Sequence, residues 1–304
     1  LMPILSGPNH ACESFVQYPY SVQGLAQSLN YVNGDFRVMK KKIDSSALAY
    51  RDFKGPFDII GDVHGCLQEL LSMVRKLGYE QSPRAKKDHG IWFHPQNRRL
   101  VFVGDLIDRG PDSVGVLLLV RTWVHQGLAL AVRGNHDDKC LRSLKGNKVE
   151  LKHGLAETLQ AIYKLEDNKR EQVKDFLSQL PNHLELDKGN LCIVHAGIND
   201  KDRGYISGRI RTFCLYGSLT GLKTSMGFPQ RIDWTKDRSE QALGLIVYGH
   251  SIVTKPYWNN NTVNIDTGCV FGGLLTALRY PECQVLSVPA QRVYVKEAQW
   301  NYVD

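Results

Sequence analysis

Three short apolar segments, each followed at once by a polar loop that contains Gly, constrain the fold of this chain more than any other feature. They are FDII at residues 57–60, LVFV at residues 100–103 and LALAV at residues 128–132. The loops after the first two lead into apolar residues at helical spacing, which predicts a strand, a loop and a helix in succession. Alternating strands and helices predict an α/β fold, with a largely parallel or mixed sheet and helices packed on its faces.

The second half of the chain predicts further helices and then a second sheet. HGLAETLQAIYKL at residues 153–165 and EQVKDFLSQLP at residues 171–181 are amphipathic with the helical period. The short apolar runs HLEL, LCIV, LIVY and TVNI follow, separated by turn residues, and predict strands. We therefore expect two sheets with helices outside them.

The composition excludes several classes of protein. With 42% hydrophobic and 23% charged residues, the chain has the composition of a globular protein. No apolar run approaches the roughly 20 residues that span a bilayer, and the first residues lack the pattern of a signal peptide. Seven scattered cysteines without CxxC pairs indicate reduced thiols, so we expect a cytoplasmic protein. The net charge of +7 favours polyanionic partners such as RNA, nucleotides or phosphorylated surfaces.

The loops after the apolar runs carry residues with the chemistry of metal ligands. The motifs are GDVHG, GDLIDRG, RGNHD, HAG and GH, and each follows a predicted strand directly. Loops at the carboxyl ends of such strands converge on one crevice. A single Asp or His in a loop is usually a turn former, but six in this arrangement predict a metal site. The candidate ligands are Asp62, His64, Asp105, Asn135, His195 and His250.

Oxygen and imidazole ligands without thiolates suit Mn, Fe, Zn, Co or Mg. Two such ions about 4 Å apart acidify a bridging water, neutralise phosphate oxygens and orient an in-line attack. The predicted site therefore favours hydrolysis of a phosphoester or phosphoanhydride.

These motifs, in this order, resemble the signature of the calcineurin-like metallophosphoesterase superfamily over about residues 57–285. The resemblance implies an αβ-sandwich with two divalent ions, Mn first among them, between the two sheets. It assigns one metal to Asp62, His64 and Asp105. It assigns the other metal to Asp105, which bridges, and to Asn135, His195 and His250.

One departure from the family pattern narrows the branch. Some members read GHxH at the last motif, where this chain has GHSI with Ile252. The departure indicates the branch of protein Ser/Thr phosphatases, ApaH-like dinucleoside polyphosphatases and bacterial polynucleotide kinase-phosphatases. In that branch Arg109 resembles the phosphate clamp. His136 resembles the general acid, oriented by Asp108.

Four segments of the second half are similar to the ApaH-like phosphatases and to the phosphatase module of polynucleotide kinase-phosphatases. They are KCLRSLKG, HGLAET, GRIRTFCLYG and NIDTGCVFGG. Charged and polar residues in or near the motifs are candidates for substrate binding: Arg109, Arg133, Asn135, Lys139, Arg142, Arg209 and Arg211.

Several of these candidates have a structural alternative. A structural ion pair is equally expected for Arg133. Arg209 and Arg211 alternatively face opposite sides of a strand. His153 and Glu157, four residues apart on a predicted helix face, either form a local pair or contact the substrate. For Tyr216 and Phe271 we favour core packing over stacking on a base.

The first 54 residues differ from the rest because they are polar, rich in turn residues and include the basic run RVMKKK. We expect residues 1–54 to form an N-terminal extension and residues 55–304 to form the catalytic domain. The basic run is interpreted as a solvated surface, with contact to an anionic ligand as the alternative.

We expect hydrolysis of a phosphoanhydride in a nucleotide polyphosphate, of the dinucleoside tetraphosphate or RNA-cap type. The chain lacks the GxxxxGK[ST] loop of a kinase module. The first alternative is removal of 2′- or 3′-end phosphates from RNA, and the second is a protein Ser/Thr phosphatase. A non-catalytic scaffold that binds RNA or a partner is the last, and it predicts the loss of a ligand or of His136. None is lost.

Overall fold

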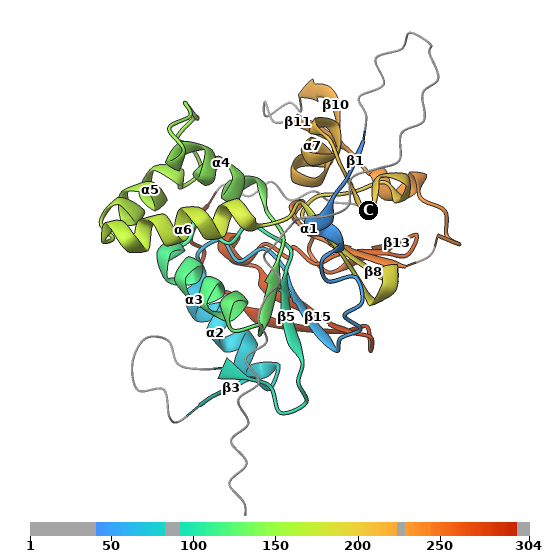
Figure 1. Ribbon diagram of the computed structural model, residues 1–304, viewed down its shortest axis with the longest axis horizontal. Helices are drawn as coiled ribbons and strands as arrows, with labels where there is room; N and C mark the ends of the chain where they lie inside the picture. Colours follow the sequence, from blue (N-terminus) through green and yellow to red (C-terminus); the bar gives the residue numbers. More distant parts are fainter. Residues whose placement is uncertain (1–40, 83–91, 224–228, 243, 297–304) are drawn as a thin grey trace, which may run out of the picture. The chain divides into compact units, whose positions relative to one another are not determined.

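The structure, a computed structural model, describes residues 41–82, 92–223, 229–242 and 244–296. Its centre is a pair of five-stranded mixed sheets (Figure 1). In the first, with strand order β16-β15-β2-β5-β6, β2, β5 and β6 are parallel, and β15 and β16 are antiparallel additions at one edge. The strands are β2 (Phe57–Ile60), β5 (Arg99–Phe102), β6 (Ala129–Ala131), β15 (Leu274–Tyr280) and β16 (Gln284–Pro289).

The second sheet has the order β13-β14-β12-β8-β7, with three parallel central strands and an antiparallel strand at each edge. Its strands are β7 (His183–Leu186), β8 (Leu191–Val194), β12 (Leu245–Tyr248), β13 (Tyr257–Asn259) and β14 (Thr262–Asn264).

The two sheets face each other across an apolar core. Phe57 and Ile59 of β2 lie in this core, whereas Ile60 belongs to the core on the outer face of the first sheet. Side chains alternate between the two faces of a strand, so a run that is apolar throughout can serve both cores. This alternation explains why FDII contains no exposed position.

Helices cover the outer face of the first sheet. α2 and α3 pack on its strands, and α4, α5 and α6 pack against α3 and each other (Figure 1). Their bounds are α2 (Leu67–Lys76), α3 (Ser113–His125), α4 (Asn135–Leu144), α5 (Leu155–Tyr163) and α6 (Asp167–Gln179). None of the described helices has the length and apolar composition needed to cross a membrane.

The outer face of the second sheet carries α7 (Gly208–Tyr216), which buries Ile210 and Cys214 against β8 and β12. The alternative of a strand through Arg209 and Arg211 is therefore wrong. Ser207 caps the helix by accepting a hydrogen bond from the backbone of Ile210, a local signal that favours a helix start.

The remaining elements are short. Two hairpins and four single turns of 3₁₀-helix complete the described chain. They are β3 (Glu80–Gln81) with β4 (Trp92–Phe93), β10 (Ser218–Lys223) with β11 (Pro229–Ile232), and η1 (Asp187–Gly189), η2 (Asp200–Asp202), η3 (Trp234–Asp237) and η4 (Cys269–Phe271).

Part of the predicted extension is built into the folded unit. β1 (Lys42–Ile43) pairs with β9 (Tyr205–Ile206), and α1 (Ser45–Leu48) packs on β7. Lys41 of the basic run forms an ion pair with Asp202. Residues 37–40 of the basic run, with the rest of residues 1–40, lie outside the described residues.

A buried guanidinium joins three strands of the first sheet. Arg98 precedes β5, and its Nε donates to both carboxylate oxygens of Asp58 at 3.0 Å. Its Nη1 donates to Glu282 at 2.8 Å, and its Nη2 donates to the carbonyl oxygens of Phe57 and Tyr280. Arg98 thereby satisfies polar groups of β2 and of the end of β15.

We expect Arg98→Met to lower the free energy of unfolding by about 3–5 kcal/mol, because it leaves the fully buried Asp58 carboxylate without its main partner. Chemical denaturation measures this change. The matched control is Arg170→Met, which removes a surface pair with Asp167 and should cost less than about 1 kcal/mol. Equal effects of the two substitutions would contradict the prediction.

Candidate metal centre and active site

The loops that carry the predicted ligands leave the carboxyl ends of strands in both sheets and meet between them. Asp62 and His64 follow β2, Asp105 follows β5, Asn135 follows β6, His195 follows β8 and His250 follows β12. All six residues are buried except His250, which is half-buried. The fold thus brings into contact residues that lie up to 188 positions apart in the sequence.

The backbone of these loops is unusual. His64, Asp105, Asp108, Arg109 and His250 all have positive φ, between 46° and 71°. Such conformations are costly for residues other than Gly and persist where the surroundings enforce them, which is frequent at functional sites. Their concentration here indicates that the fold holds these side chains in fixed directions.

One group of donor atoms surrounds the Nε2 atom of His195. That atom lies 3.0 Å from Asn135 Oδ1, 3.0 Å from His250 Nδ1 and 3.4 Å from Asp105 Oδ2. The other ring nitrogen, Nδ1, bonds to the carbonyl oxygen of Val103, which leaves Nε2 available as a ligand atom. The ligand atoms of Asp105, His195 and His250 all lie within 4.8 Å of one another, a spacing that can hold a metal ion.

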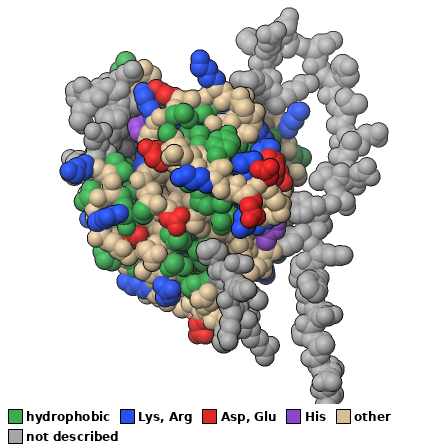
Figure 2. Space-filling view, turned by 90° about the vertical axis from the view of Figure 1, so that its left-hand side faces the viewer, with side chains coloured by type: hydrophobic (Ala, Val, Ile, Leu, Met, Phe, Trp, Pro, Cys, Tyr) green, Lys and Arg blue, Asp and Glu red, His purple; other side chains and the backbone are tan. Residues whose placement is uncertain are grey.

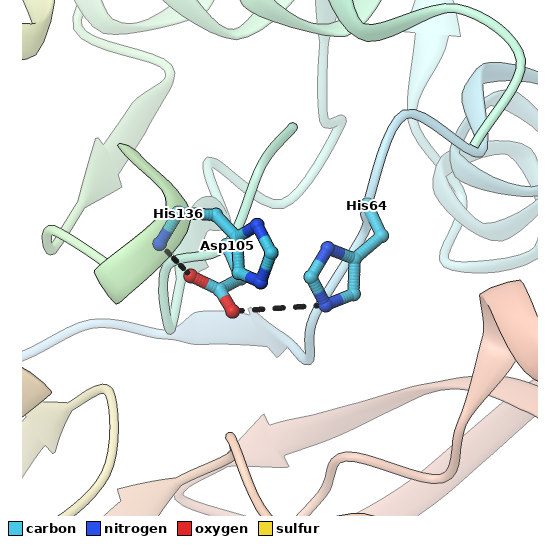
Figure 3. A group of neighbouring side chains, drawn as sticks. All are labelled: His64, Asp105 and His136. Carbon is cyan, nitrogen blue, oxygen red and sulfur yellow. Dashed lines mark hydrogen bonds and ion pairs between the residues drawn. The ribbon is translucent and has the colours of Figure 1, made fainter. Parts of the chain in front are cut away.

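A second group shares Asp105 (Figure 3). Its Oδ1 accepts a hydrogen bond from the backbone N–H of His136 at 2.9 Å, and its Oδ2 faces His64 Nε2 at 3.6 Å. The Nδ1 of His64 bonds to the carbonyl oxygen of Ile107, so Nε2 is again the atom left for a metal. His64, Asp105 and His136 satisfy the same 4.8 Å spacing.

Asp62 lies at the edge of these groups, and its carboxylate accepts a hydrogen bond from the backbone of His250 at 3.2 Å. Burial and the nearby carboxylates of Asp266 and Asp105 raise the pKa of Asp62 well above its usual range. Burial also raises the pKa of Asp266 to about 6. Buried carboxylates that oppose one another's ionisation fit divalent cations, which would offset the repulsion.

His136 and Asp108 form a buried pair, with His136 Nδ1 2.6 Å from Asp108 Oδ2. Burial raises the pKa of Asp108 to about 7 and lowers that of His136 to about 3. The Asp108 backbone is itself held by Ser113, whose Oγ also accepts a hydrogen bond from Thr158 of α5.

Arg109 reaches the edge of the metal-ligand groups. Its Nη1 lies 3.0 Å from His64 Nε2, and its guanidinium carbon lies 5.2 Å from the ring centroid of Phe271. Phe271 is buried in the main core, which agrees with a packing role, and it also lines the cavity described below. Its face also supports the guanidinium through a cation–π contact.

A cavity of about 780 Å³ opens beside these groups. Asp105, Asn135 and His250 line one part of it, and His136 and Arg109 line another. This volume lies in the range of sites for small organic ligands and greatly exceeds what one phosphoryl group requires.

Two residues at the site were missed by the sequence analysis. Arg231 of β11 lines the cavity and donates to the carbonyl oxygen of Tyr216 at 2.6 Å. Asp266 follows β14 and lies close enough to Asp62 to raise its pKa. The QRIDW segment around Arg231 carries no motif signal. Asp266 had one, because it follows the apolar run TVNI as the other ligands follow theirs.

The structure separates the candidate phosphate-binding residues into two kinds. Three already have protein partners. Arg133 donates to the carbonyl oxygens at residues 177 and 178, Arg209 pairs with Asp202, and Arg211 pairs with Asp138.

Two further candidates, Lys139 and Arg142, make no ion pair with any described residue. Lys139 is half-buried and lines the cavity, and Arg142 is exposed in the last turn of α4. The alternative of a local pair between His153 and Glu157 along a helix is wrong, because α5 begins only at Leu155.

Comparison with known proteins identifies the family. The calcineurin-like phosphoesterase family matches residues 55–273. The chain belongs to this family. The prediction of a metal-dependent phosphoesterase from the motifs is therefore confirmed, as is the use of divalent metal ions.

Relatives of this phosphoesterase cover most of its length. It is 46% identical over 245 residues to the asymmetrical bis(5′-nucleosyl)-tetraphosphatase PrpE of Anoxybacillus flavithermus. This alignment covers 79% of this chain and 97% of that protein. It is 44% identical over 250 residues to the protein of the same name from Halalkalibacterium halodurans, across 81% and 98%.

Solved structures confirm the predicted two-sheet fold. A crystal structure of a protein provisionally assigned as a diadenosine tetraphosphatase superposes with a TM-score of 0.55 at 27% identity, over 78% of this chain and 94% of that one. A protein serine/threonine phosphatase from Saccharomyces cerevisiae gives a TM-score of 0.52 at 16% identity, over 81% and 83%. The second likeness is one of fold alone.

Gly154 of the HGLAET segment packs tightly against the loop that carries Asp108 and Arg109. Gly154 has φ +89°, and a Cβ atom built there would overlap the backbone nitrogen of Arg109. The segment therefore packs directly on the Asp108 and Arg109 backbone, whose positive φ values it helps to impose.

We expect Gly154→Ala to reduce the rate of phosphoester hydrolysis at least about tenfold, because the methyl group would displace Arg109, which the motif predicts to bind the reacting phosphate. Steady-state kinetics and thermal unfolding measure the effect. Gly146→Ala is the matched control, since Gly146 also has a positive φ of +81° but no atom within 4 Å of the built Cβ. Equal activity of the two variants would contradict the prediction.

Proposed function

We propose that this phosphoesterase hydrolyses a phosphoanhydride bond of a dinucleoside tetraphosphate, yielding a nucleoside monophosphate and a nucleoside triphosphate. The observation that carries the proposal is the cavity, which joins the candidate metal ligands to space for several further phosphates and to the unpaired Lys139. The alignments cover nearly the whole length of the relatives, and the names of these relatives support the same substrate and the asymmetrical cleavage.

We assign Asp62, His64 and Asp105 to one divalent ion, and Asp105, Asn135, His195 and His250 to the other. When bound, two such ions supply Lewis-acid activation of water and neutralise charge on the phosphoryl oxygens, and Mn is our first choice of metal. Cavity walls of imidazole, carboxylate and amide, without a described thiol among the ligand atoms, fit this choice.

The remaining roles fall to three side chains. Arg109 holds two phosphoryl oxygens with its planar guanidinium. His136 donates a proton from Nε2 to the oxygen of the departing phosphate, because its Nδ1 is occupied by Asp108. Asp108 fixes the orientation of the ring. Arg231, from the opposite wall, is a further phosphoryl-binding candidate.

The alternatives with other substrates would use the same residues. The non-catalytic scaffold would in addition require a basic surface that binds RNA. On the face shown in Figure 2, the described Lys and Arg side chains are interspersed with Asp and Glu and form no single basic patch. This distribution gives no support on that face to a scaffold that binds RNA through a basic surface. We place the enzyme in the cytoplasm because five of its cysteines are buried as free thiols.

The substrate is tested by incubating the Mn-loaded protein with diadenosine tetraphosphate, capped RNA, RNA with 2′- or 3′-phosphate ends and a phosphopeptide. We expect the highest kcat/KM for diadenosine tetraphosphate, with AMP and ATP as the products by mass. ADP as the sole product would contradict asymmetrical cleavage. Preferred release of inorganic phosphate from RNA ends would favour the phosphomonoesterase alternative instead.

The role of His136 is tested by His136→Ala, with Asp105→Asn as the control that removes a bridging ligand. We expect His136→Ala to lower kcat by about 10²–10⁴-fold, the contribution typical of a general acid, while the bound metal measured by mass spectrometry stays the same. Asp105→Asn should lower the metal content. Loss of metal from His136→Ala would make His136 a ligand, and normal turnover would remove its catalytic role.

A further inference from the structure

The cavity continues past His136 into a region that the proposed reaction has not used. Lys139 of α4 lines this region, together with His153 and Gly154 before α5 and Glu157 within it. It is thus built from the KCLRSLKG and HGLAET segments, which lie on neighbouring elements of the fold.

Lys139 is positioned to meet an anion next to His136. The two residues are three apart on α4, so they project from the same side of the helix. Lys139 has no carboxylate partner among the described residues, whereas Arg133 and Arg211 share Asp138 close by. A half-buried ammonium group that lines a cavity without a counter-ion has unused capacity to bind an anion.

His153 approaches the same place from the other side. Its ring contacts that of His136 edge-on, with 6.5 Å between the centroids. Its φ of 58° and the fit of Gly154 against Arg109 fix the direction in which the side chain leaves the backbone. Burial and the charges of Arg109 and Lys139 lower the pKa of His153, and an imidazole ring offers at least one N–H donor in either protonation state.

The contacts of the His136 ring connect the metal-ligand groups to this region of the cavity. The His136 ring touches His64 of the metal groups, with 4.9 Å between centroids, and also touches His153. With the proposed roles, a phosphoryl group held by Arg109 has its departing oxygen at His136. The phosphates attached to that oxygen then extend toward Lys139 and His153, and the carboxylate of the exposed Glu157 limits the anion-binding part on that side.

We propose that Lys139 and His153 form a subsite for the phosphates of the leaving group, with the polyphosphate tail of a nucleoside triphosphate as the ligand. This assignment rests on the proposed function. The water oxygen bonds to the phosphorus of the nucleotide that becomes the monophosphate, and this water releases one proton to the solvent. The bond from that phosphorus to the next bridging oxygen breaks, and this oxygen takes its proton from His136 and leaves as part of the triphosphate.

The direction of cleavage follows from this arrangement and is tested in heavy-oxygen water. Attack with the triphosphate as leaving group places the heavy oxygen in AMP. Attack with AMP as leaving group gives the same two products but places the heavy oxygen in ATP. Mass spectrometry of the products separates the two, and a label in ATP would overturn the assignment of the subsite.

The subsite itself is tested without any tetraphosphate. The affinities of the Mn-loaded full chain for ATP and for AMP are measured by calorimetry with Mn in excess. We expect the preference of the wild type for ATP over AMP to fall about tenfold in Lys139→Ala, the effect of one charge-assisted hydrogen bond, and to return in Lys139→Arg. His153→Gly, which keeps the left-handed backbone and removes the ring, should lower the same preference.

The control is Lys145→Ala, which removes the same charge at the exposed end of α4 and should leave the preference unchanged. Equal losses of ATP and AMP affinity in Lys139→Ala, or no loss, would overturn the subsite. A wild type that fails to cleave diadenosine tetraphosphate but shows the Lys139-dependent preference for ATP would instead remove the proposed substrate and leave the subsite standing.

Discussion

The carboxylate of Asp105 is the group on which the rest of the site depends. It is almost fully buried, and its two oxygens are shared among the backbone of His136 and the rings of His64 and His195. These partners come from loops of both sheets, so one side chain ties the two halves of the sandwich together at the crevice. Although burial opposes its ionisation, the nearby rings of His195 and His136 hold the pKa of Asp105 well below its usual range. Burial and the carboxylates of Asp266 and Asp105 instead raise the pKa of Asp62, and a divalent cation would offset this repulsion.

The strands and the candidate ligands could be predicted because both depend on local signals. A run such as LVFV is apolar throughout because it faces two cores, and the loop after it must carry polar residues since it opens on the crevice. Both signals, the apolar run and the polar motif GDLIDRG, stand within a few residues of each other. Asp266 obeys the same rule after β14, so its place in the site was readable, although its distance from the other carboxylates was not.

What the sequence could not reveal depends on long-range contacts. Arg211 meets Asp138 across 73 positions, and Arg231 reaches the cavity from a hairpin with no motif. A list of basic residues near the motifs cannot separate those that the fold neutralises from those that it leaves for a ligand. The net charge of +7 was therefore a weak guide, because three of the six candidate cations are held by carboxylates or carbonyl oxygens.

The segment at residues 153–158 connects recognition of the leaving group with that of the reacting phosphate. Gly154 packs on the backbone of Arg109, and Thr158 bonds to Ser113, which in turn holds the backbone of Asp108. His153, on the same segment, belongs to the proposed subsite for the further phosphates. A ligand that contacts His153 is therefore linked through these contacts to the loop that carries Asp108 and Arg109. In this arrangement binding energy from phosphates that do not react can be used to position the one that does, so a polyphosphate substrate gains in kcat as well as in KM.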